Sequence, residues 1–198
     1  MDFSSAPATY AIIAATVLVS LYAFNAPPQF IDDFAMKVGA VTRTRGHHRI
    51  ITSAFLHAGP FHLLLNMLSF WSFGPAIERI LGTDGMIVLY FGSAVASSLM
   101  ILLNNRRNPD YAAIGASGAV SGVILSFCLF YPLAPLYLFG LPWGVPAVIF
   151  AVLYLALSSH LMRTPDRVIS HEGHLGGAIG GVILTVLMRP DALARFFG

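Results

Sequence analysis

Charged residues are scarce in this chain of 198 residues, because Asp, Glu, Lys and Arg together make up only 10% of it. A soluble globular domain typically has about a quarter of its residues charged, whereas 57% of this chain is hydrophobic. The core of a soluble protein of this size could not hold so much apolar surface, so the composition predicts an integral membrane protein. The net charge of +2 is too small to suggest nucleic acid as a partner.

Cysteine and N-terminal basic residues are also lacking. The single cysteine, Cys128, excludes an intramolecular disulfide and lies in an apolar run, where we expect it to pack as a small hydrophobic residue. No Lys or Arg precedes the first apolar run, so the start of the chain lacks the basic segment of a cleaved signal peptide. We therefore expect the first run to be a permanent membrane span.

Six apolar runs are long enough, or nearly so, to cross a bilayer as helices, which takes about 17–25 residues. They lie at about 8–25, 61–81, 85–104, 114–131, 141–159 and 172–188. Helices are expected because strand alternation is absent and a bilayer leaves no backbone group free to go unpaired. The sequence thus predicts one all-α membrane domain over residues 1–198. The long connection at 26–60 should carry short amphipathic helices in the membrane interface, one of them near 50–57.

Glycines at helical spacing predict close helix packing in two of these runs. Residues four apart share one face of a helix, and a face without side chains lets another helix approach closely. Gly118 and Gly122 have this spacing in the fourth run, next to Ser117, and the last run repeats it beside His174. The residues expected to pack closely are Gly115, Gly118, Gly122, Gly177 and Gly181.

Ser117 and His174 each lie next to glycines that let two helices pack closely (a glycine seam). Close packing can bring the serine and the histidine within hydrogen-bonding reach, as an activated nucleophile requires. Ser117 would be the nucleophile, and His174 the general base that passes the proton to the leaving amine. Glu172 lies two positions from His174, about 200° round a helix, and should point away, which favours a dyad over a triad. Ser121, one helical turn after Ser117, is the rival nucleophile. Ser117 is preferred because it lies at the start of the predicted helix, where water can reach it.

The second run carries two polar residues, His62 and Asn66, which are four apart and share one face. Polar groups at membrane depth usually face the bundle interior or a wet cavity and indicate function. An anionic tetrahedral intermediate needs waiting hydrogen-bond donors. His62, Asn66 and the backbone N–H of Ser117 could supply them.

Two other classes of function remain open at this point. His57 and His62 could form a metal site with His171 and His174, although the last two are three apart rather than the four of the zincin motif. A metal-dependent enzyme or transporter would then result. Alternatively, a non-catalytic binder or chaperone could use the same cleft for membrane helices.

The chain resembles the rhomboid family of intramembrane serine proteases. The matching motifs are Gly115-Ala116-Ser117-Gly118, His62-Leu63-Leu64-Leu65-Asn66, Glu78-Arg79 followed by Gly82, and His174-Leu175-Gly176-Gly177 with Gly181. They fall in the family's order on the second, fourth and sixth runs. The resemblance implies a six-helix bundle whose long first loop, 26–60, is partly embedded in the membrane.

The resemblance also implies the chemistry. Ser117 would be the nucleophile and His174 its base, while His62, Asn66 and the Ser117 amide would bind the oxyanion, without metal or cofactor. The substrate would be a single-pass membrane protein whose helix unwinds near the bilayer surface. A rhomboid-like pseudoprotease that only binds membrane helices is the alternative, and retention of both Ser117 and His174 argues against it.

Two positions depart from the family pattern. Family members often carry an aromatic at the position of Ser121, which packs against the catalytic imidazole, so the sequence predicts that this support is missing. A Trp-Arg pair in the family's first loop is His48-Arg49 here, which predicts weaker anchoring of that loop.

The sequence indicates the membrane orientation and the host membrane less clearly than it indicates the fold. The family usually keeps its N-terminus in the cytoplasm and its active site facing out, and a bacterial inner membrane is the expected host. That orientation places Lys37, Arg43, Arg45, Arg49, Arg106, Arg107, Arg163 and Arg167 outside, against Arg79, Arg189 and Arg195 inside. This distribution opposes the positive-inside rule, so the orientation stays open, as does the oligomeric state.

Overall fold

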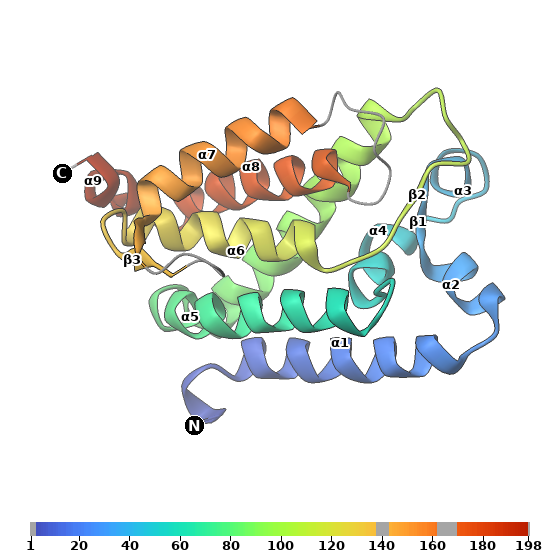
Figure 1. Cartoon of the computed structure of the whole chain (residues 1–198), viewed down its shortest axis with the longest axis horizontal. Helices are drawn as coiled ribbons and strands as arrows, with labels where there is room; N and C mark the ends of the chain where they lie inside the picture. The colour runs from blue at the N-terminus through green and yellow to red at the C-terminus, as the bar shows by residue number, and fades with distance from the viewer. Residues whose placement is uncertain (1–2, 138–142, 162–169, 198) are drawn as a thin grey trace.

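The computed structural model describes residues 3–137, 143–161 and 170–197, and helices dominate them. The longer helices are α1 (Pro7–Asn25), α5 (Pro60–Asn104), α6 (Ser117–Phe130), α7 (Ala147–Leu161) and α8 (His171–Met188) (Figure 1). Shorter helices are α2 (Pro28–Phe34), α3 (Val38–Arg43), α4 (Arg49–Thr52) and α9 (Asp191–Phe197), with 3-10 turns η1 (Phe3–Ser5) and η2 (Ser53–Phe55).

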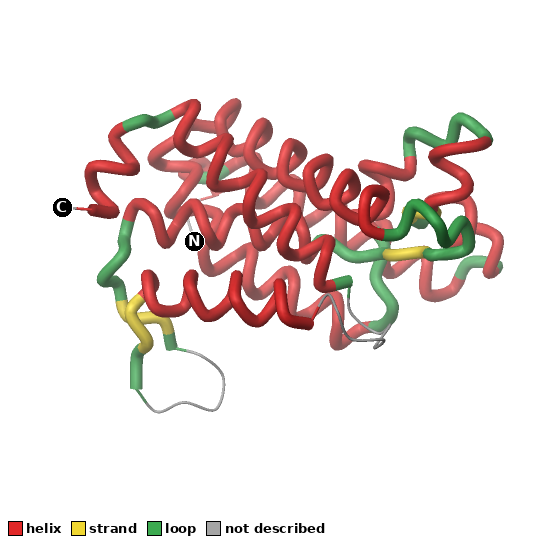
Figure 2. Tube along the Cα trace, turned by 90° about the horizontal axis from the view of Figure 1, so that it is seen from above, coloured by secondary structure: helices red, strands yellow, loops and turns green. Residues whose placement is uncertain are grey.

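Two small antiparallel sheets lie at opposite ends of the molecule (Figure 2). In the first, β1 (Met36–Lys37) pairs with β2 (Ala112–Ala113), and in the second, β3 (Pro135–Leu136) pairs with β4 (Val145–Pro146). The first sheet ties the segment after α1 to the segment that leads into α6. It thereby positions the chain just before Ser117.

Helix α5 contains both the second and the third predicted runs. It is broken at Gly82, whose φ of 76° and ψ of 169° are not helical, and a positive φ suits a residue without a side chain. The break leaves two stretches of about 22 residues, each long enough for a bilayer core. By length and composition, α1 and α5 could cross a membrane, while α6 and α7 are shorter apolar helices.

Two predicted helix starts are wrong, for tertiary reasons. The fourth run was expected from residue 114, but α6 begins at Ser117 because Ala112–Ala113 pair with β1 and Gly115 turns the chain with a φ of 132°. The fifth was expected over 141–159. Residues 141–142 lie outside the described residues, and α7 begins at Ala147 because Val145–Pro146 pair with β3.

The segment 26–60 contains several short helices, as predicted. They are α2, α3, α4 and η2, and the helix expected near 50–57 is represented by α4 and η2 at residues 49–55. In Figure 1 this segment lies at one end of the helical bundle, beside the first small sheet.

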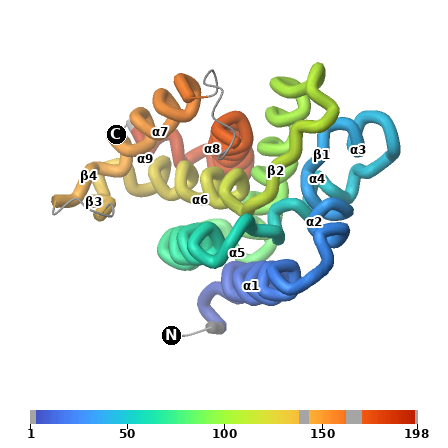
Figure 3. The backbone as a smooth tube through the Cα atoms, turned by 45° about the vertical axis from the view of Figure 1, so that its right-hand side comes forward, coloured from blue at the N-terminus to red at the C-terminus, as the bar shows by residue number. Residues whose placement is uncertain are grey.

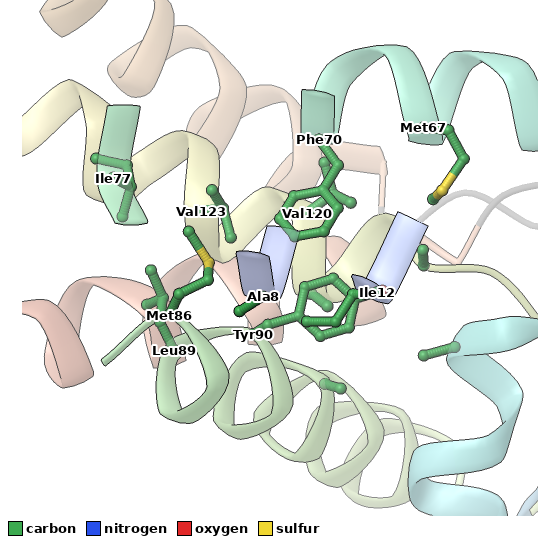
Figure 4. Packing of buried hydrophobic residues seen from close by; sticks show 14 of the residues in the cluster. Ala8, Ile12, Met67, Phe70, Ile77, Met86, Leu89, Tyr90, Val120 and Val123 are labelled. Atoms are coloured by element: carbon green, nitrogen blue, oxygen red, sulfur yellow. The ribbon is translucent and has the colours of Figure 1, made fainter. Parts of the chain in front are cut away.

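The main core joins α1, both halves of α5 and α6. Phe70 and Tyr90, from the two halves of α5, are fully buried with ring centroids 4.9 Å apart. Ile12 of α1 and Val120 and Val123 of α6 belong to the same cluster (Figure 4). Helices α5, α6 and α8 pack most extensively against one another, and α6 lies between α5 and α7 (Figure 3). These contacts place the N-terminus of α6 inside the bundle.

A buried carboxylate attaches α1 to this core. Glu78 of α5 accepts hydrogen bonds from the backbone N–H groups of Ala8 and Thr9, both at 2.8 Å, and from the Thr9 hydroxyl at 2.7 Å. The Thr83 hydroxyl donates to the same carboxylate. These bonds satisfy N–H groups that the first turn of a helix leaves free, and a negative charge is favourable there.

The predicted close approach of α6 and α8 occurs at four of the five glycines. A methyl group on Gly177 would overlap the backbone of Gly118, and one on Gly181 would overlap the backbone of Gly122. Gly115 is different, because it precedes α6 and lies on no helix. Its role is conformational and is described with the site below.

Gly177→Ala should destabilise the protein by about 2 kcal/mol or more, because its methyl group meets backbone, which cannot rotate away. Thermal unfolding in mild detergent would measure this. Gly59→Ala is the matched control, since nothing lies within 4 Å of the added methyl group. Equal unfolding temperatures for the two variants would contradict the backbone contact of α6 and α8.

Candidate active site

Ser117 and His174 meet at the crossing of α6 and α8. Ser117 is the first residue of α6, His174 lies in the first turn of α8, and the Ser117 Oγ is 2.7 Å from the His174 Nε2. Because the glycine seam brings the two backbones together, short side chains are sufficient to make this contact. The Ser117 hydroxyl can donate to Nε2, which is the geometry of a nucleophile with its general base. Both side chains line a cavity of about 280 Å³.

Glu172 points away from this pair, as predicted. Its Oε1 accepts a hydrogen bond of 2.8 Å from the Asn105 Nδ2 at the end of α5. Within the described part of the chain, no carboxylate hydrogen-bonds to the imidazole of His174. The local arrangement is therefore a Ser–His pair.

Ser121 makes hydrogen bonds other than those of a nucleophile. Its Oγ donates to the Ser117 carbonyl one turn earlier, at 2.6 Å, and contacts the Tyr154 hydroxyl. Of the two serines on this face of α6, Ser117 is the one bonded to a histidine. The geometry therefore favours Ser117 as the nucleophile.

His62 lies beside Ser117 with a donor available. The backbone N–H of Ala58 donates to the His62 Nδ1 at 3.4 Å, so in the neutral ring the proton lies on Nε2. A Cβ on Gly115 would be 2.9 Å from the His62 Cε1, 3.1 Å from its Nε2 and 3.7 Å from the Ser117 Oγ. Because Gly115, with its φ of 132°, has no side chain, the His62 ring can lie close to the Ser117 hydroxyl.

Asn66 lies one turn further along α5 and lines the same cavity as Ser117. Its Nδ2 donates one hydrogen to the His62 carbonyl at 2.9 Å, which leaves its second amide hydrogen for a ligand. His62, Asn66 and the backbone of Ser117 are thus grouped round one cavity.

His57 has a role that the sequence did not reveal. It is only 1% exposed. The Ser20 hydroxyl donates to the Phe55 carbonyl, so its oxygen must accept the Nδ1–H of His57, at 2.9 Å. The His57 Nε2 is then free to accept the Ala116 N–H at 3.4 Å. A neutral His57 therefore joins α1 to the residue just before Ser117.

Acid should weaken the fold through His57. Burial, and then the nearby His62, lowers the pKa of His57 from 6.5 to about 4. An unfolded chain takes up this proton near pH 6.5, so the stabilisation is complete above that pH and is lost as the pH falls toward 4. At pH 5 the loss is about 2 kcal/mol, at about 1.4 kcal/mol per pH unit. Unfolding temperatures at pH 7.5 and 5 should therefore differ more in the wild type than in His57→Gln, and equal differences would contradict this role.

His48 and Arg49 both hydrogen-bond carbonyl groups of the first loop, and its weaker anchoring relative to the family stays a prediction. The His48 Nε2 hydrogen-bonds the Asp33 carbonyl at 3.1 Å. The Arg49 Nη1 donates to the carbonyls of Asp32 and Ala35, the second at 3.1 Å. A histidine ring can replace a larger aromatic here because its N–H reaches the end of α2.

The four histidines considered as metal ligands include two pairs with neighbouring rings. The ring centroids of His57 and His62 are 4.9 Å apart, and those of His171 and His174 are 6.1 Å apart. Over residues 3–137, 143–161 and 170–197, no three His, Cys, Asp or Glu side chains are grouped closely enough to hold a metal ion.

Tyr154 of α7 is a site residue that the sequence analysis missed. Its ring stacks on the His174 ring with centroids 6.4 Å apart and planes 19° apart. The aromatic support expected to be missing at Ser121 thus comes from another helix. A signal was present, because Phe150 and Tyr154 are four apart and mark one aromatic face of α7.

A second hollow, of about 360 Å³, is also lined by His62. It is bounded by the loop segment after α1 and by the strand that leads to Ser117, and its lining includes Ile31, Lys37, Tyr111 and Ala113. His62, Ile114 and Ser170 line both hollows. The two hollows are therefore neighbours, and Ser117 lines the first of them.

Comparison with known proteins agrees with these features. The family model for the Rhomboid domain matches residues 44–191. "Rhomboid protein 1, mitochondrial" of Saccharomyces cerevisiae is 34% identical over 143 residues, which are 68% of this chain and 40% of that protein. "Putative rhomboid protease YdcA" of Bacillus subtilis is 34% identical over 142 residues, 70% of this chain and 66% of that protein. "Rhomboid protease GluP" of Bacillus subtilis is 29% identical over 133 residues, 67% of this chain and 24% of that protein. The chain thus matches about a quarter to two thirds of the length of these relatives.

Proposed function

Since this chain belongs to the rhomboid family, we propose that it is an intramembrane serine endopeptidase that cleaves transmembrane segments. The observation that carries the proposal is the 2.7 Å contact between the Ser117 Oγ and the His174 Nε2, at the edge of a cavity. Two of the three relatives described above have names that call them proteases, one of them putative. We propose the same protease activity for this chain.

The proposed fold is one membrane domain over residues 1–198 with six crossings. These are α1, the two halves of α5, α6, α7 and α8, and the segment 26–60 is partly embedded in the membrane. The break at Gly82 supports this count, because it divides one long helix into two of bilayer length. A bacterial plasma membrane is the proposed host.

In the proposed reaction, the Ser117 Oγ attacks the scissile carbonyl carbon while its proton passes to the His174 Nε2. The tetrahedral intermediate collapses when His174 gives that proton to the leaving amine, and an acyl-enzyme remains on Ser117. Water, activated by His174, then releases the second fragment. The Ser–His pair is sufficient for these proton transfers.

The oxyanion of the intermediate would be bound by three donors. These are the Nε2–H of His62, the second amide hydrogen of Asn66 and the backbone N–H of Ser117. The N–H of Ser117 belongs to the first turn of α6, where N–H groups lack helical acceptors and the helix dipole favours negative charge. Donors that are already in place stabilise charge without reorganisation.

The proposed substrate is a single-pass membrane protein. A helical segment hides its carbonyl groups in its own hydrogen bonds, so cleavage requires a stretch that unwinds. The two hollows that His62 lines would hold that stretch in extended form. A segment with Gly or Pro near the bilayer surface would unwind at least cost.

Purified protein in detergent, mixed with a single-pass substrate that has a Gly/Pro stretch near its membrane boundary, tests the proposal. We expect two fragments, and equal rates with and without a chelator. Loss of cleavage with chelator would instead support a metal-dependent enzyme. Tight binding of an uncleaved substrate would favour a pseudoprotease, which is the alternative function for the same cleft.

A further inference from the structure

We infer that Tyr154 is a positioning residue for His174, and that Ser121 holds Tyr154 in place. This inference rests on the proposed function, because it assigns His174 the role of base. It adds a contact between α7 and the Ser–His pair, which otherwise belongs to α6 and α8. Its basis is the chain of contacts from Ser117 through Ser121 and Tyr154 to His174.

The His174 ring contacts two other rings. Tyr154 is stacked on it, with planes 19° apart, while His171 meets it edge-on at 84°. A centroid distance of 6.4 Å is within the range of attractive aromatic pairs. Such contacts restrict rotation of the imidazole, and they keep its Nε2 directed at Ser117. A displacement of about 1 Å in a catalytic group can cost about 100-fold in rate.

The number of hydrogens on each hydroxyl shows which group donates in the hydrogen bond between Ser121 and Tyr154. A serine hydroxyl has one hydrogen, and that of Ser121 is donated to the Ser117 carbonyl. The Tyr154 hydroxyl must therefore be the donor in its bond with the Ser121 Oγ. Tyr154 is thus fixed through Ser121 to the backbone of the nucleophile itself.

The rest of α7 packs on α6 and α8 through apolar side chains, in a cluster that includes Leu155 of α7, Leu125 of α6 and Ala178 of α8. The described buried residues of α7 are only Ala147, Ala151 and Ser158, and outward side chains such as Leu153 are 61% exposed. The contacts of Tyr154 with Ser121 and His174 therefore supply the polar link from α7 to the site. They explain why a small, polar residue at position 121 is compatible with an ordered base.

Steady-state cleavage by variants tests the inference. Tyr154→Leu removes the ring and should lower kcat by about 100-fold, with KM little changed. Tyr154→Phe keeps the ring and should retain most of the activity, with a loss of about 5-fold, the effect of one hydrogen bond. Ser121→Ala should have a similar effect, and the double variant Ser121→Ala/Tyr154→Phe should be no slower than either single variant. Leu153→Ala, on the outward side of α7, is the control and should behave as the wild type.

The outcomes separate this inference from the proposed function. An active wild type with equal kcat in Tyr154→Leu, or a change in KM alone, would overturn the positioning role while leaving the endopeptidase intact. A wild type with no cleavage would overturn both. If Tyr154→Leu fails to fold, the double variant decides, since additive losses from Ser121→Ala and Tyr154→Phe would show that the two groups do not act through one bond.

Discussion

Replacing His174 with alanine should reduce cleavage of a membrane substrate by about 10⁴-fold or more. In Ser–His sites the two residues act as a unit, so loss of the base removes nearly all that the nucleophile contributes. Here the imidazole is the group within 2.7 Å of the Ser117 Oγ. The effect should appear in kcat, because the proposed role of His174 is to transfer the proton of Ser117 and not to bind the substrate.

His171→Ala is the matched control for this result. His171 lies on the same helix, and its ring meets that of His174 edge-on, but no hydrogen bond joins it to Ser117. We expect a small loss of activity in this variant, from a slightly less ordered imidazole. Comparable losses in the two histidine variants would mean that His174 is not the specific base.

Removing the proposed oxyanion donors, His62 and Asn66, should give the second largest effect. His62→Ala and Asn66→Ala should each lower kcat by about 100- to 1000-fold, the usual cost of one donor to a tetrahedral intermediate. KM should change little, because these donors act on charge that develops only during the reaction. Kinetics with a peptide from an unwound substrate segment would measure both constants.

Ser69→Ala provides the comparison for these two variants. Ser69 lines the same cavity of about 280 Å³, so its replacement controls for a change in cavity polarity. It should leave kcat within a few-fold of the wild type. A rise in KM with little change in kcat, or equal effects at Ser69, would argue that His62 and Asn66 shape the cavity instead of binding an oxyanion.

Much of the arrangement could be predicted from local patterns. Glycines at spacing four indicated where α6 and α8 approach, and the structure places Ser117 and His174 at that approach. The angular position of Glu172 on α8 was enough to separate it from the imidazole. These predictions succeed because they depend on helix periodicity, which a sequence displays directly.

Other features depend on contacts between distant segments and could not be read from periodicity. The start of α6 at Ser117 follows from strand pairing with Met36–Lys37, about 80 residues earlier. The backbone N–H groups that donate to Glu78 lie on α1, 69 and 70 residues away. Tyr154 was visible as an aromatic on α7, but its contact with His174 requires knowing which face of that helix meets the site.

The central claim, that Ser117 is activated by His174, is tested most directly by covalent labelling. Purified protein in mild detergent would be treated with a fluorophosphonate, which reacts with activated serines, and the labelled residue identified by mass spectrometry of its peptides. We expect one label per chain, on Ser117, and none in the His174→Ala variant. A label on Ser121, or full cleavage activity in an unlabelled Ser117→Ala variant, would contradict the claim.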